Sequence, residues 1–163
     1  MTDPTPNTPT RRGSATTGSR RRTSPSLVTA LLTLAWLVPG GVVLQAVLAG
    51  QAWFVSPGLF GLHGGIGHGV LMLAVLTAGL AWVCELSRPA AILASVAVVG
   101  LIGQTGLGYV GHRGGVALAS ALHVPLGVSI LGLTVAVAVL VTVRRADDAA
   151  GRRPAAVEQA DRS

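Results

Sequence analysis

The sequence contains no lysine, and charged residues of every kind make up only 11% of its 163 residues. Aromatic residues are also scarce, at 4%, whereas half of all residues are apolar. This low charge excludes an ordinary soluble domain, and the high apolar content excludes a wholly disordered chain. Lipid is therefore the expected solvent around the core.

The single cysteine, Cys84, excludes an internal disulfide and a thiolate zinc cluster. Its position at the end of an apolar run predicts a packing role rather than a redox role. The sequence also lacks the nucleophile–base pair, phosphate-binding loop or paired carboxylates typical of hydrolases and kinases. Whether the protein is an enzyme stays open.

Four apolar runs are each long enough to cross the roughly 30 Å hydrocarbon core of a bilayer. The predicted spans cover about residues 27–50, 62–83, 90–110 and 117–143. They predict an all-α fold, a polytopic transmembrane four-helix bundle at residues 27–143. The flanking segments 1–26 and 144–163 lack apolar periodicity and are expected to be disordered tails.

The positive charge comes entirely from arginine and flanks the apolar runs, which favours a topological role over nucleic-acid binding. Only Arg113 lies on the side of the spans opposite to the other arginines. The positive-inside rule then predicts a multi-pass protein of the cell (plasma) membrane with both termini cytoplasmic. Ser19 to Arg22 is similar to a twin-arginine export signal, but the following run is too long for one, which favours an uncleaved anchor.

A short pattern, L-H-x-x-x-G, occurs twice, at Leu62–Gly67 and at Leu122–Gly127. Each copy sets a glycine one helical turn after a histidine. A glutamine precedes each histidine by a similar interval, Gln45 before His63 and Gln104 before His123. The chain therefore reads as two pseudo-symmetric helical hairpins related by an axis through the bundle.

Two histidines at matching depth in a membrane suggest that they share a ligand, because an unpartnered histidine in lipid is costly. Neutral imidazoles bind haem iron axially, and facing helices of a bundle supply the pocket. The sequence thus predicts haem b between His63 and His123, with His68 as an alternative ligand. Gly67 and Gly127 would leave room for the porphyrin, Gln45 and Gln104 would hydrogen-bond a propionate or an imidazole, and Arg113 would pair with a propionate.

The segment Leu44–Gly50 and the two histidine motifs resemble an uncharacterised family of small actinobacterial four-span proteins. More distantly, the layout is similar to the four-helix units of cytochrome b561 and haem A synthase. This resemblance implies haem-binding histidines and electron transfer, with a quinone or a redox protein as partner. The chain departs from these units by lacking an acidic residue in the first hairpin and a second histidine pair.

Two other functions fit the same residues. The second prediction is an accessory or structural membrane subunit without a cofactor, in which the glutamines and histidines only hold helices together. Alternatively, the histidines form an outward-facing transition-metal site, since imidazole suits zinc and copper. That site would use all four histidines: His63, His68, His112 and His123.

Overall fold

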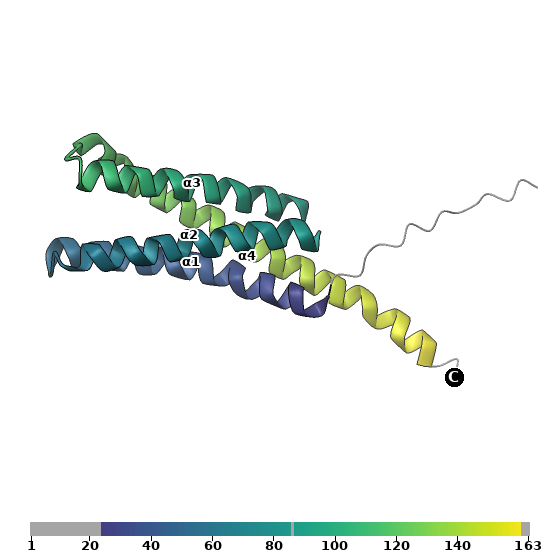
Figure 1. Cartoon of the computed structure of the whole chain (residues 1–163). Coiled ribbons are helices and arrows are strands. Elements are labelled where there is room, and N and C mark those ends of the chain that lie inside the picture. Colours follow the sequence, from purple (N-terminus) through teal and green to yellow (C-terminus); the bar gives the residue numbers. More distant parts are fainter. Residues whose placement is uncertain (1–23, 86, 161–163) are drawn as a thin grey trace, which may run out of the picture.

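The computed structural model describes residues 24–85 and 87–160, with side chains placed up to residue 151. This part of the chain forms four helices (Figure 1): α1 (Pro25–Phe54), α2 (Leu59–Cys84), α3 (Arg88–His112) and α4 (Ala117–Ala160). All four are long and apolar enough to cross a membrane. The predicted all-α, four-span architecture is confirmed, and the protein is an integral membrane protein with lipid-facing helices.

Prolines and a serine cap define where helices begin. Pro25 and Pro89 lie in the first turn of α1 and α3, where a missing N–H costs nothing. The Ser87 hydroxyl accepts a hydrogen bond from the Ala90 amide at the start of α3. At the other end of α3, His112 is the last helical residue. The third span is predicted to cover about residues 90–110, so α3 continues two residues beyond it and includes His112.

Helix α4 continues well beyond the bundle, along the yellow end of the ribbon in Figure 1. The segment predicted to be a C-terminal tail from residue 144 is helical as far as Ala160. Alanine and arginine are strong helix formers, and no proline interrupts the first turns outside the bundle. The predicted N-terminal tail falls almost entirely outside the described residues.

The helices pack in ring order, each against its two neighbours, α1 on α2, α2 on α3, α3 on α4 and α4 on α1. Within the described residues, α1 and α3 are diagonal partners, as are α2 and α4. Short connections join α1 to α2 and α3 to α4 at one end of the bundle. The chain thus forms two hairpins that run antiparallel throughout.

The two hairpins are pseudo-symmetric in their packing as well as in their sequence. Residues 61–83 of α2 and 121–143 of α4 share the same burial class at each step, except that Leu76 is exposed and Ala136 is half-buried. Two interhelical hydrogen bonds also correspond. Trp36 donates to the Thr142 hydroxyl between α1 and α4, and Trp82 donates to the Ser95 hydroxyl between α2 and α3.

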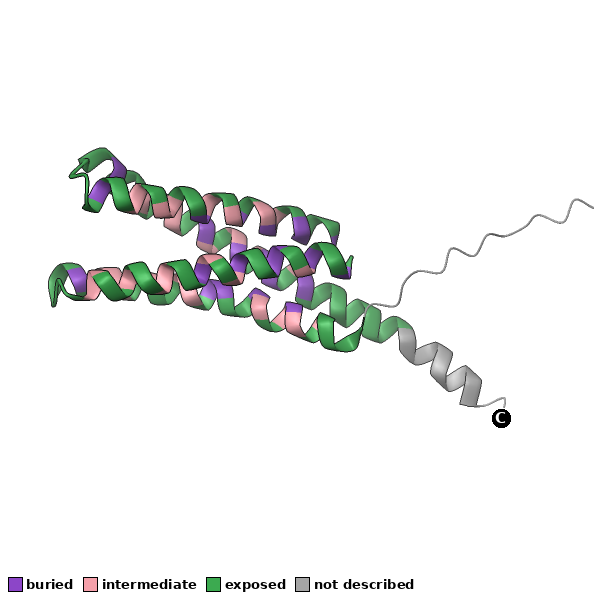
Figure 2. Ribbon diagram, viewed as in Figure 1, coloured by how far each residue is buried: buried purple, intermediate pink, exposed green. Residues whose placement is uncertain are grey.

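Burial divides the bundle into two halves (Figure 2). We call residues 25–41, 70–101 and 130–143 the alanine half, because alanines such as Ala35, Ala94 and Ala138 form its fully buried core. Cys84 is part of this core. We call residues 42–69 and 102–129 the histidine half. Few of its residues are fully buried, which leaves the interior of this half to polar side chains.

Candidate functional site

The two motif histidines face each other inside the histidine half. His63 comes from α2 and His123 from α4, the diagonal pair of helices. Their ring centroids are 6.4 Å apart, and the ring planes are inclined by 60°. Both residues are half-buried. The parallel helices α2 and α4 thus bring the two rings into one interior, whereas their role as metal ligands stays a prediction.

The His63 ring is held by a backbone group of the neighbouring helix. Its Nδ1 lies 3.1 Å from the carbonyl oxygen of Gln45. A carbonyl only accepts, so Nδ1 carries the proton and donates, and Nε2 of the neutral ring keeps its lone pair. This is the arrangement that fixes the tautomer and orientation of a metal-binding histidine.

The His123 ring occupies the corresponding place in the second hairpin without the corresponding hydrogen bond. A Cβ added to Gly108 would lie 3.2 Å from Cε1 of His123, so the ring packs closely on the α3 backbone. The Gln104 carbonyl is the nearby backbone acceptor. However, Nδ1 of His123 is buried and has no partner within hydrogen-bond geometry. The two histidines therefore occupy equivalent positions, but only the His63 ring is held by a hydrogen bond to a backbone carbonyl.

Each motif glycine lies under the glutamine of its own hairpin. A Cβ on Gly67 would be 3.5 Å from Oε1 of Gln45, and one on Gly127 would be 3.0 Å from Nε2 of Gln104. The space expected to be free beside each histidine is therefore occupied by an amide side chain. Nε2 of Gln45 and Oε1 of Gln104 are buried without hydrogen-bond partners.

The other two histidines are not brought to this pair. His68 contacts Tyr109, with 6.1 Å between ring centroids, and His112 lies 4.4 Å from the Phe60 ring centroid. Among the described residues, no three metal-binding side chains come together. The predicted four-histidine metal site is therefore wrong, because His68 and His112 point to different neighbours around the helices.

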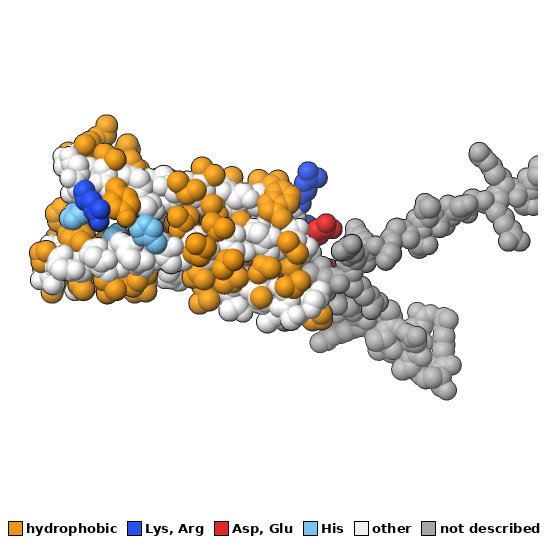
Figure 3. Space-filling model, in the orientation of Figure 1, with side chains coloured by type: hydrophobic (Ala, Val, Ile, Leu, Met, Phe, Trp, Pro, Cys, Tyr) orange, Lys and Arg blue, Asp and Glu red, His pale blue; other side chains and the backbone are white. Residues whose placement is uncertain are grey.

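Arg113 caps the end of α3 next to His112. Figure 3 shows basic and histidine side chains together at one end of the bundle. Cζ of Arg113 is 4.8 Å from the centroid of the Tyr109 ring, a cation–π distance. The Tyr109 hydroxyl in turn is 3.4 Å from Nε2 of His68. Sequence reasoning missed Tyr109. The available signal was a lone tyrosine next to Gly108 at the end of the predicted third span.

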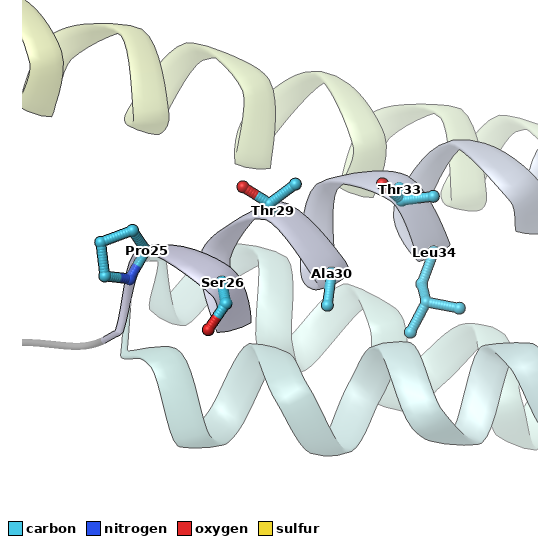
Figure 4. A pocket seen from close by; sticks show the side chains of 6 residues that line it. All are labelled: Pro25, Ser26, Thr29, Ala30, Thr33 and Leu34. Atoms are coloured by element: carbon cyan, nitrogen blue, oxygen red, sulfur yellow. The ribbon is translucent and has the colours of Figure 1, made fainter.

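A hollow at the start of α1 lies far along the chain from these residues (Figure 4). One helix lines it, and its polar groups are the hydroxyls of Ser26, Thr29 and Thr33. It contains no titratable side chain and offers no chemistry comparable to that of the histidine half.

Fold and site define a four-helix integral membrane protein with a polar interior in one half. Residues 45–110 match the model of DUF6220, a family of unknown function. The matched segment runs from Gln45 through His63 and Gln104 and ends before His123. No curated protein matches the chain, and no solved structure does. The resemblance to cytochrome b561 and haem A synthase units stays a prediction.

Proposed function

We propose that the protein binds haem b between His63 and His123 and acts in electron transfer in the membrane. The observation that carries this proposal is the facing histidine pair, one ring from each hairpin, with centroids 6.4 Å apart. Two imidazoles that share one metal ion, with bonds of about 2.0 Å on each side, have ring centres roughly 6 Å apart. The separation fits axial ligation of a single ion.

The polar atoms around the pair also fit a bound group. A buried polar atom without a partner costs about 1–3 kcal/mol, so three of them in one region call for an occupant. Here these atoms are Nδ1 of His123, Nε2 of Gln45 and Oε1 of Gln104. A haem bound here would supply one-electron redox chemistry at its iron.

Each residue around the pair would then have a separate role in holding the haem. His63, fixed by the Gln45 carbonyl, presents Nε2 in a defined orientation. His123 supplies the opposing ring from α4. The Gln45 and Gln104 amides, lying over Gly67 and Gly127, provide donors to the same interior. Arg113 supplies a cation at this end of the bundle, where a propionate would be neutralised.

We also propose that this end faces outward and that both termini are cytoplasmic. The exposed residues Arg88, Arg144 and Arg145 lie at the opposite end from Arg113, because Arg88 begins α3 and Arg113 follows its last residue. Cytoplasmic segments carry the excess of arginine and lysine in membrane proteins. A quinone or a redox protein on the outer side would then exchange electrons with the site.

The test is the visible spectrum of the full-length protein, expressed with ample haem and purified in detergent, before and after reduction with dithionite. Wild-type protein is expected to show a sharp band on reduction. The His63→Ala, His123→Ala double variant is expected to lose it. His112→Ala is the matched control, because it removes a histidine at the same end that lies against Phe60 instead.

Featureless wild-type spectra would overturn the proposal. So would a band that survives in the double variant and disappears with His112→Ala. In the first case, the amides and the imidazole would only hold the helices together. The protein would then be an accessory subunit rather than a haem protein. Elemental analysis of the same sample would separate that outcome from a colourless metal bound by the pair.

A further inference from the structure

We propose that His68, Tyr109 and Arg113 form a binding site for a lipid-soluble hydroquinone on the outside of the bundle, between α2 and α3. We call these three residues the Tyr109 cluster. They do not belong to the His63–His123 pair, and the proposal stands without bound haem. It rests on the exposure of these side chains, on an acceptor nitrogen of His68 that can take a further hydrogen bond, and on the absence of equivalent polar residues in the other hairpin.

The cluster is open to the membrane. His68 is exposed, and Tyr109 is 42% exposed, although both lie within helices that span the bilayer. Arg113, which caps the end of α3, lies at the edge of the span, whereas His68 lies within it. A ligand that contacts both is therefore an amphipathic molecule that enters from the lipid with its polar group at the membrane surface.

The hydrogen bonds of the cluster leave one strong acceptor underused. Nδ1 of His68 lies 2.7 Å from the Gly64 carbonyl oxygen and must donate to it. With the proton on Nδ1, Nε2 is an acceptor, and within the described residues the Tyr109 hydroxyl lies 3.4 Å from it. That is long for such a bond, so Nε2 can accept a better-placed hydroxyl.

The chemistry of the ligand follows from these groups. A phenolic hydroxyl donates to Nε2 of His68 and accepts from the Tyr109 hydroxyl or from the Arg113 guanidinium. The guanidinium, held 4.8 Å from the Tyr109 ring centroid, also stabilises negative charge on that oxygen. A hydroquinone is a lipid-soluble molecule with this hydroxyl. The oxidised quinone has only carbonyl oxygens and cannot donate to Nε2.

The second hairpin shows that the fold does not require the cluster. Under the internal repeat, Val128 of α4 corresponds to His68, and Gly50 and Phe54 of α1 correspond to Tyr109 and Arg113. The α1–α4 face is therefore apolar where the α2–α3 face is polar. Since the two faces pack in the same way, the polar residues serve something other than packing.

The cluster also lies next to the histidine pair. Tyr109 follows Gly108, whose backbone contacts the His123 ring, and His68 follows His63 by five residues on α2. A ligand at the cluster would be about one helical turn from the interior of the histidine half.

The test measures binding of decylubiquinol, kept reduced under anaerobic conditions, to the full-length protein in phosphatidylcholine nanodiscs, by quenching of tryptophan fluorescence. We expect saturable binding that is about fivefold weaker for decylubiquinone, because one hydrogen bond of about 1 kcal/mol is lost. His68→Val and Tyr109→Phe should weaken decylubiquinol binding by about the same factor. Tyr109→Phe keeps the ring beneath Arg113 and removes only the hydroxyl.

Val128→Ala, at the equivalent position of the other hairpin, is the matched control and should bind as wild type does. The His63→Ala, His123→Ala variant should also retain binding, which separates this site from the proposed haem site. Equal affinity for the oxidised and reduced forms would overturn the proposal. So would binding lost only in the double histidine variant, or an Arg113-dependent preference for phosphatidylglycerol nanodiscs without saturable decylubiquinol binding.

Discussion

The two halves of the bundle share the same four helices and the same internal symmetry, yet they are built from different contacts. In the alanine half, small side chains bring the helices together, and Ala35, Ala90 and Ala138 are at most 1% exposed. In the histidine half, the interior at the same radius contains two histidines and two glutamines. Close apolar packing stabilises the first half, whereas the second keeps polar atoms in a low-dielectric interior.

This difference separates stability from function along the bundle axis. Helix association in lipid depends on packing, because lipid tails are as apolar as the side chains. A half that packs tightly can hold the helices in register while the other half carries groups that packing alone would disfavour. Substitutions in the alanine half should therefore change stability first, and those in the histidine half should change ligand binding first.

The largest effect on stability is expected from Ala138→Leu, at the centre of the alanine half. Ala138 is 0% exposed, so three added carbons have no free space. Overpacking of this kind costs about 3 kcal/mol. The measurement is unfolding by SDS from mild detergent micelles, followed by far-UV circular dichroism. Val139→Leu, next along α4 and 44% exposed, is the control and should stay within about 0.5 kcal/mol of wild type. Equal losses in both variants would mean that the alanine half is not tightly packed.

Glycine-to-alanine substitutions in the two halves should change the free energy of unfolding by an intermediate amount. A Cβ on Gly41 would lie 2.7 Å from Cγ2 of Val70, and one on Gly100 would lie 3.1 Å from Cγ1 of Ile130. Branched side chains adjust poorly, so we expect losses of about 2 kcal/mol for Gly41→Ala and about 1 kcal/mol for Gly100→Ala. In the histidine half, Gly67→Ala makes an ordinary contact at 3.5 Å from Oε1 of Gln45.

Gly67→Ala should therefore unfold at the same SDS fraction as wild type or slightly above it, since alanine favours a helix by up to about 1 kcal/mol over glycine. A loss at Gly67 as large as that at Gly41 would show that the histidine half is packed as closely as the alanine half. It would thereby remove the distinction between them.

Much of this architecture is readable from the sequence. Four apolar runs of sufficient length predict four spans, and the repeated L-H-x-x-x-G motif predicts that His63 and His123 lie in corresponding places. The differences concern the ends of helices. α3 ends at His112 rather than near residue 110, and α4 continues past residue 143 to Ala160, because helix ends depend on local hydrogen bonds that composition does not reveal.

The candidate site is harder to predict from the sequence, because the direction of each side chain around its helix decides which residues belong to the site. Spacing alone allowed four histidines in one site, whereas the structure turns His68 toward Tyr109 and His112 toward Phe60. It also allowed open space beside Gly67 and Gly127, where the glutamines lie. The matching motifs do not reveal that Nδ1 of His63 is hydrogen-bonded to the Gln45 carbonyl, whereas Nδ1 of His123 has no partner within hydrogen-bond geometry.

The smallest expected effect tests the symmetry that both halves share. Trp36→Phe removes the hydrogen bond to Thr142 between α1 and α4, and Trp82→Phe removes the one to Ser95 between α2 and α3. Interhelical hydrogen bonds in membranes average about 0.6 kcal/mol, so each variant should lose about that much in SDS unfolding, by the same amount on both faces. Thr142→Val combined with Trp36→Phe should cost little more than Trp36→Phe alone, because the other hydrogen bond of the Thr142 hydroxyl is to the Ala138 carbonyl of its own helix. Losses that differ several-fold between Trp36→Phe and Trp82→Phe would show that the two hairpin interfaces are alike in sequence position and unlike in energy, which would confine the pseudo-symmetry to the path of the backbone.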